Sequence, residues 1–138
     1  MRLNHVFVVL TAALLSQTSW AQSLSVDWVW LRAHQCSKAS PEIKVSGIPA
    51  GAVELKVDML DNDMPSFNHG GGVVAHDGSA VEATIAQGAL QRYVGPCPPN
   101  FSSFGHDYQI TVTALGADKA ALGSGKATKT FSAKAVPQ

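Results

Sequence analysis

The chain has little charge and no cluster of charge of one sign. Lys and Arg number 10, Asp and Glu number 10, and charged residues make up 14% of the 138 residues. Proteins that bind nucleic acid need grouped cations to neutralise phosphates, and no basic run is present. A basic amphipathic stretch that could lie on a membrane is also missing. The composition therefore argues against a nucleic-acid partner and against a membrane-surface helix.

No hydrophobic run is long enough to cross a bilayer, which takes about 20 residues. The apolar run Val6–Leu15 follows Arg2, and Ser19-Trp20-Ala21 puts small residues at the two positions that a signal peptidase reads. The sequence predicts a signal peptide over residues 1–21, cleaved after Ala21, with an N-terminal anchor as the alternative. Residues 22–138 then form one domain, periplasmic or secreted, with no transmembrane segment.

Cysteine is scarce as well. The chain has two, Cys36 and Cys97, and no CxxC pair. Disulfides persist in exported proteins, and an even count favours a single bridge, with two free thiols as the alternative. A bridge between these positions would close a loop of about 60 residues and stabilise the fold by about 3 to 4 kcal/mol in the chain-entropy model.

Residues 22–138 instead show the alternation of apolar and polar residues that is typical of strands. Apolar and polar residues alternate over Val53–Met59 and again over Tyr108–Ala114, which puts one apolar face on each predicted strand. Turn-rich joints separate the segments, so we predict an all-β fold, a β-sandwich with little helix. Weaker strand patterns cover Leu24–Leu31, Ile43–Val45, Val73–Ala75, Val81–Ile85 and Lys126–Lys134.

Three other segments carry weaker predictions. Ala83–Leu90 is compatible with a short helix, and Asp118–Leu122 with a single helical turn. The small residues of Gly116–Gly125 predict a mobile surface loop. His34, in a polar loop near Cys36, is expected to have no functional role.

Unusual polar residues gather in two segments. Asp61–Pro65 follows the first alternating segment and leads to Asn68–Gly72, whereas Gly95–Pro99 leads toward His106–Tyr108. Each has an ordinary reading, because Asp and Asn before Pro are common turn residues and three glycines alone are weak evidence for a phosphate loop. The two segments together in one chain are more specific evidence for a functional site than either segment alone.

In this combination the chain resembles the phosphatidylethanolamine-binding protein family, in particular its bacterial Raf-kinase-inhibitor-like branch. The resemblance covers Ser40–Leu115, and the last element is the most specific. The matching elements are Ser40-Pro41-Glu42-Ile43, Gly47-Ile48-Pro49, Asp61-Asn62-Asp63-Met64-Pro65, His69, Tyr93-Val94-Gly95-Pro96-Cys97-Pro98-Pro99 and His106-Asp107-Tyr108.

The resemblance implies a β-sandwich with Greek-key connections and a small anion-binding pocket at one end. The two histidines and the tyrosine would supply hydrogen-bond donors, while an aspartate would hold a His ring in the tautomer that points N–H at the ligand. It also implies that a Cys36–Cys97 bridge braces the pocket loop. The ligand-binding residues that carry over are Asp61, Asp63, His69, Pro99, His106 and Tyr108.

The chain also departs from the family pattern. Gly70-Gly71-Gly72 stands where the family has an aromatic residue, so one wall of the pocket is expected to be open or reshaped. The segment between Ile85 and Tyr93 is short, and no C-terminal helix follows Leu122. The chain therefore looks like a trimmed member of the family.

These observations predict a protein that binds a small anionic ligand bearing phosphate or carboxylate, without a cofactor and without catalysis. One alternative is a regulator or inhibitor that docks a partner protein, as yet unknown, through the pocket rim. Another is a metal or enzyme site, although neither H-E-x-x-H nor G-x-S-x-G is present. Its candidate ligands are Asp61, Asp63, His69, His76 and His106.

Overall fold

The computed structural model describes residues 21–99 and 104–138; the predicted signal peptide falls almost wholly outside these ranges. Within them the chain forms nine strands and one short 3-10 helix, so the all-β fold is confirmed. The elements are β1 (Gln22–Ser23), β2 (Ser25–Trp28), η1 (Arg32–His34), β3 (Ile43–Ser46), β4 (Glu54–Asp61), β5 (Asn68–Ala75), β6 (Glu82–Ile85), β7 (Arg92–Tyr93), β8 (His106–Leu115) and β9 (Ala121–Phe131).

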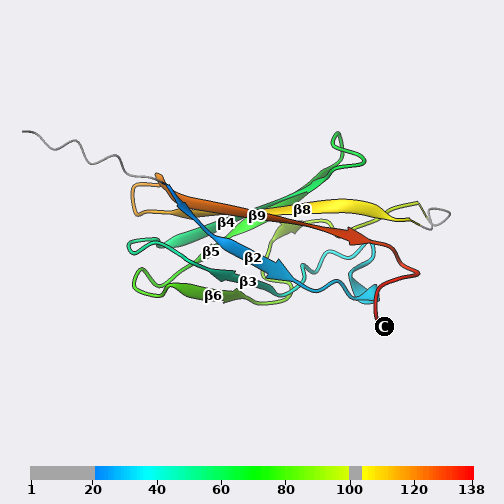
Figure 1. Cartoon of the computed structure of the whole chain (residues 1–138), viewed down its shortest axis with the longest axis horizontal. Coiled ribbons are helices and arrows are strands. Elements are labelled where there is room, and N and C mark those ends of the chain that lie inside the picture. Colours follow the sequence, from blue (N-terminus) through cyan, green and yellow to red (C-terminus); the bar gives the residue numbers. More distant parts are fainter. Residues whose placement is uncertain (1–20, 100–103) are drawn as a thin grey trace, which may run out of the picture.

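The strands form two sheets, a larger one in the order β1-β9-β8-β4-β5-β7 and a smaller one in the order β2-β3-β6. Figure 1 shows the small sheet lying against the large one. All pairs are antiparallel except β1 with β9, which is parallel. The chain crosses between the sheets after β1, β3, β5 and β6, because the strands before and after each crossing belong to different sheets.

The alternating segments build the core. Met59 lies opposite Ile110, and Val57 lies opposite Val112, so the apolar faces of β4 and β8 coincide. Ile43 and Ile85 of the small sheet are buried against them. Each such side chain stabilises the fold by about 1.5–3 kcal/mol when fully buried. This packing holds β4 and β8 in place, and with them the segments that follow or precede their ends.

The helix predicted over Ala83–Leu90 is wrong. Its first residues belong to β6, whose Ile85 and Thr84 pair with Ile43 and Lys44 of β3. A turn follows, in which the Gly88 N–H donates to the Ser40 carbonyl oxygen. Pairing with a neighbouring strand satisfies more backbone groups than one isolated helical turn could, so the tertiary context overrides the local pattern.

The mobile loop predicted over Gly116–Gly125 is also wrong in its second half. Residues 116–120 make a tight turn, and Ala121 begins β9, which pairs along β8 as far as Phe131. The Asp118–Leu122 segment is part of this turn and strand and is not helical. In the described part of the chain, no helix is long and apolar enough to cross a membrane.

Candidate functional site

The predicted site residues meet at one end of the large sheet. Asp61 is the last residue of β4, and its strand partner on β8 is Tyr108. His106 begins β8, and His69 is the second residue of β5. The hydrogen-bonded register of β5, β4 and β8 therefore brings together residues that are far apart in the sequence.

Asp61 is the centre of this cluster and is 3% exposed. Its Oδ1 accepts the N–H groups of Asp63 and Met64 at 2.9 and 3.0 Å, and its Oδ2 lies 2.7 Å from Nδ1 of His106. Burial raises the pKa of Asp61, but these hydrogen bonds outweigh burial, so the net pKa is lowered. The carboxylate is therefore charged and acts only as an acceptor.

The partners of the two histidines determine their tautomers. Nδ1 of His69 lies 2.8 Å from the Val94 carbonyl oxygen, and Nδ1 of His106 faces the Asp61 carboxylate. Both partners only accept, so each Nδ1 carries the proton and each Nε2 of a neutral ring carries a lone pair. Asp61 thus holds His106 in the tautomer opposite to the one predicted. The Nε2 of the neutral ring carries a lone pair and can only accept a hydrogen bond.

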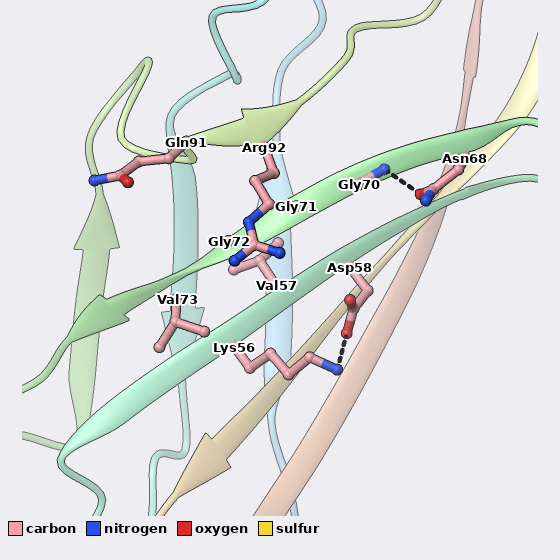
Figure 2. Close-up of a pocket in the computed structure, with 10 residues that line it drawn as sticks. All are labelled: Lys56, Val57, Asp58, Asn68, Gly70, Gly71, Gly72, Val73, Gln91 and Arg92. Atoms are coloured by element: carbon pink, nitrogen blue, oxygen red, sulfur yellow. Dashed lines mark hydrogen bonds and ion pairs between the residues drawn. The ribbon is translucent and has the colours of Figure 1, made fainter.

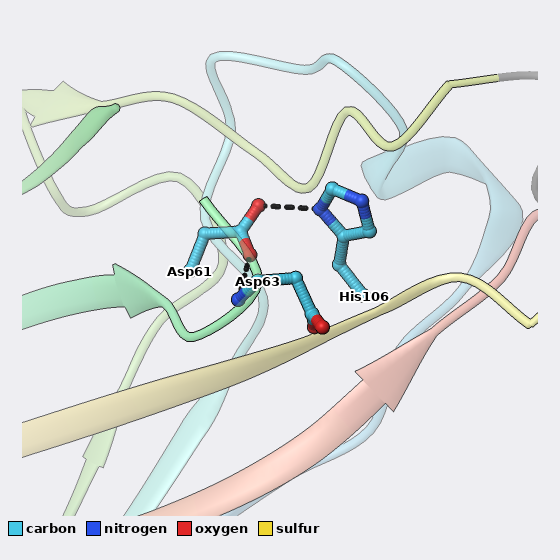
Figure 3. Close-up of side chains that lie close together, drawn as sticks. All are labelled: Asp61, Asp63 and His106. Atoms are coloured by element: carbon cyan, nitrogen blue, oxygen red, sulfur yellow. Dashed lines mark hydrogen bonds and ion pairs between the residues drawn. The ribbon is translucent and has the colours of Figure 1, made fainter. Parts of the chain in front are cut away.

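Asp63 and His106 form the outer part of the cluster. Asp63 is exposed, its Oδ2 accepts the Asp107 N–H at 2.7 Å, and the His106 side chain is 15% exposed. One ligand atom each from Asp61, Asp63 and His106 lie within 4.8 Å of one another. Figure 3 shows that Nε2 of His106 faces away from both carboxylates. A metal ion between them would have to displace the Asp61–His106 hydrogen bond.

His76, a further metal-ligand candidate, does not join the cluster. It follows the other end of β5, and its Nε2 lies 2.8 Å from the Ala80 carbonyl oxygen. The candidate metal ligands therefore separate into two places. His69 stands between them in the sequence but belongs to the Asp61 cluster, with its Nε2 3.8 Å from Asp61 Oδ2.

Aromatic rings surround His69. Tyr108 meets it edge to face with the ring centroids 5.2 Å apart, and Phe67 packs on it at 4.6 Å. Burial, then the Asp61 charge, raises the pKa of Tyr108. Phe67 was missed in the sequence, because it lies in the turn before β5, where two-residue alternation gives no signal.

The loop Val94–Pro99 holds His69 from the other side. Besides accepting from its ring, Val94 donates its N–H to the His69 carbonyl oxygen at 2.9 Å. Cys97 is joined to Cys36 by a disulfide with the Cα atoms 4.6 Å apart, and the Cys36 N–H donates to the Pro96 carbonyl oxygen. Pro99 is half-buried at the end of this loop. No hydrogen bond joins it to the cluster among the residues that the structure describes.

His34, predicted to lie in a polar loop, is buried in a short helix. It is 2% exposed and lies in η1, just before Cys36. Its Nδ1 accepts the Leu31 N–H at 2.9 Å, and its ring meets Trp30 edge to face. Burial lowers the pKa of His34. The polar composition around it misled the prediction because the turn folds the ring inward.

The three glycines after His69 line an open groove of about 530 Å³ on the exposed face of β4, β5 and β7. Figure 2 shows Arg92 extending across the strand at Gly71 and Gly72, while Lys56 and Asp58 pair at 3.0 Å on the neighbouring strand. That these glycines open or reshape one wall of the pocket stays a prediction. The groove faces away from the buried side of β4, which carries Asp61.

Gly70 and Gly71 are required for the pairing of β5. Gly70 has a φ of +67°, and a Cβ there would lie 1.7 Å from the Arg92 carbonyl oxygen. A Cβ on Gly71 would lie 1.8 Å from the Val57 carbonyl oxygen. Both glycines let the neighbouring backbones approach β5 closely, which explains why residues of loop-like composition form a strand.

Comparison with known proteins agrees with the site motifs. The model of the family described as phosphatidylethanolamine-binding protein matches residues 30–137. No curated protein matches the chain significantly. The match covers most of the chain and includes every residue of the cluster and both cysteines. The chain therefore belongs to the phosphatidylethanolamine-binding protein family.

Proposed function

We propose that this protein binds a small anionic ligand, bearing phosphate or carboxylate, at the cluster around Asp61. The observation that carries the proposal is the pair of histidines: each is anchored through Nδ1, which leaves Nε2 for a ligand. The proposed ligand-binding residues are Asp61, Asp63, His69, His106 and Tyr108, with Pro99 at the edge.

The charge of the site sets a condition for anion binding. With neutral rings, both Nε2 atoms carry lone pairs and Asp61 and Asp63 add negative charge, so an anion is repelled. When His69 and His106 are protonated, each Nε2 becomes an N–H donor, and Asp61 stabilises the charged ring of His106 at 2.7 Å. A protonated ring at either position therefore offers an anion the donor that a neutral ring lacks.

Calorimetry with sulfate tests the proposal, and we expect the wild type to bind it. The double substitution H69A with H106A should abolish binding. The matched control is H76A, at the far end of β5, which should bind like the wild type. Equal binding by the double variant would refute the proposal.

We further propose that the protein is exported, to the periplasm or outside the cell. The disulfide supports this, because such bonds persist in oxidising compartments. β1 begins at Gln22, the residue after the predicted cleavage position, and pairs with β9. N-terminal sequencing of the protein from expressing cells should begin at Gln22; an intact Met1 in the mature protein would contradict export by this route.

A further inference from the structure

The disulfide between Cys36 and Cys97 lies at the surface, although it fastens the loop Val94–Pro99 beside the cluster. Both cysteines are exposed, and Cys36 has a φ of +51°, in the left-handed region that favours glycine. Exposed or strained disulfides are reduced more easily than buried, relaxed ones. A small thiol can therefore reach this bond while the protein stays folded.

The fastened loop carries groups that hold the site. Val94 accepts from Nδ1 of His69 at 2.8 Å and donates its own N–H to the His69 carbonyl oxygen at 2.9 Å. Burial and the Asp61 charge raise the pKa of Tyr108, whereas the backbone N–H of Cys97 lowers it, because this N–H interacts with the hydroxyl oxygen. One cysteine of the disulfide therefore interacts directly with a residue of the cluster.

Two backbone hydrogen bonds join the loop to the η1 turn beside the disulfide. The Cys36 N–H donates to the Pro96 carbonyl oxygen at 2.8 Å, and the Gly95 N–H donates to the Ser37 carbonyl oxygen at 2.7 Å. A Cβ at Gly95 would lie 2.4 Å from the His34 carbonyl oxygen, so the two backbones approach closely. Backbone hydrogen bonds can be exchanged for bonds to water, so the covalent bond is what makes this close approach permanent.

We propose that the redox state of the Cys36–Cys97 disulfide regulates the ligand site, with tight binding in the oxidised protein and weak binding in the reduced protein. The inference rests on the proposed function. The reductant is a dithiol. One of its thiolates attacks a sulfur of the disulfide and expels the other cysteine, and its second thiolate then resolves the mixed disulfide. The dithiol becomes a disulfide, while the protein gains two electrons and its two thiolates take up two protons.

Reduction acts on the site through Val94. Without the covalent bond the loop can move away from the η1 turn, and with it the carbonyl oxygen that keeps the proton of His69 on Nδ1. The ring then presents Nε2 to the ligand for only part of the time, and the apparent affinity falls by that fraction. Asp61 and His106 are held by the pairing of β4 with β8 and keep their contact. Reduction should therefore weaken binding without abolishing it.

Calorimetry with sulfate should compare the oxidised protein, the protein reduced with dithiothreitol and the double variant C36S with C97S. All are measured at one pH, below their melting temperatures. We expect the reduced protein and the double variant to bind alike, about tenfold more weakly than the oxidised protein, which corresponds to a loop in place about a tenth of the time. Dithiothreitol should not change the affinity of the double variant, which controls for effects of the reductant itself.

Hydrogen exchange gives a second measurement that needs no ligand. On reduction, exchange of the Val94 N–H should accelerate more than exchange of the Val57 N–H in the centre of the large sheet. Equal acceleration at both positions would show that reduction only lowers the stability of the whole fold, and the inference would be refuted.

The other outcomes separate the inference from the proposed function. If the oxidised and reduced proteins bind sulfate equally well, redox control is refuted and the proposed function stands. If dithiothreitol releases no alkylatable thiols from the folded protein, or if reduction unfolds it, the disulfide is purely structural and the inference is refuted. If the oxidised protein binds no sulfate, the proposed function fails and the inference fails with it.

Discussion

At the scale of single residues, Asp61 organises the site. One carboxylate accepts two backbone N–H groups of the turn after β4 and the ring N–H of His106. Each hydrogen bond to a charged group contributes about 1.5–3 kcal/mol, and at 3% exposure none competes with bulk water. The same side chain therefore ends the strand, shapes the turn and orients the ring of His106.

Phe67 and Val94 act on His69 in different ways. Phe67, which is 44% exposed, covers the ring, whereas the Val94 carbonyl oxygen fixes which nitrogen carries the proton. A ring held by both has little freedom to turn its Nδ1 toward a ligand. His69 is therefore limited to binding through Nε2.

At the scale of elements, β5 depends on Gly70. In Gly70→Ala, the new Cβ would meet the Arg92 carbonyl oxygen at 1.7 Å, and the φ of +67° disfavours any L side chain. The β5–β7 pair would have to separate at Tyr93, its partner. We expect a loss of about 2 to 4 kcal/mol in the free energy of unfolding, measured by urea denaturation.

Gly78→Ala is the matched control for this substitution. A Cβ at Gly78 would have its nearest neighbour at 3.7 Å, which is ordinary contact. Its stability should stay within about 0.5 kcal/mol of the wild type. Equal stability of the two variants would contradict the requirement for glycine in β5.

The disulfide links the η1 turn to the loop Val94–Pro99. It spans 61 residues, and closing such a loop in the unfolded chain is worth about 4 kcal/mol in the chain-entropy model. The Gly95 N–H donates to the Ser37 carbonyl oxygen beside it, which adds a second connection. The segment that holds His69 is thus fastened to the part of the chain before β3.

At the scale of the whole molecule, the sequence predicts the strands with two-residue alternation best. The segments around Val57 and Val112 show it because one face is buried and the other is not. Strand β6 falls within the weaker strand prediction over Val81–Ile85, whereas the start of β9 was predicted as a loop and is determined by pairing with β8. Composition alone could not predict pairing with a strand distant in the sequence.

The candidate site was also predicted only in part from the sequence. Motif resemblance selected Asp61, His69, His106 and Tyr108, and the structure brings these four together. The tautomer of His69 could not be predicted, because it depends on the carbonyl oxygen of Val94, which lies 25 residues away in the sequence.

The buried His34 makes the stability of the whole molecule depend on pH. Its pKa is lowered from 6.5 by burial, so below about pH 6.5 the unfolded chain takes up a proton that the folded chain does not. The free energy of unfolding should therefore fall as the pH drops from about 7.5 to about 5, by at most about 1.4 kcal/mol per pH unit from this residue.

His34→Asn isolates this contribution, because an amide oxygen can accept the Leu31 N–H in place of Nδ1 and does not titrate. Urea denaturation of both proteins should show the stability difference between wild type and H34N shrinking as the pH falls. The carboxylates and the other histidines titrate alike in both, so they cancel in this difference. Parallel pH profiles would show that the folded chain admits the proton at His34, which would require the η1 turn to open with the ring charged.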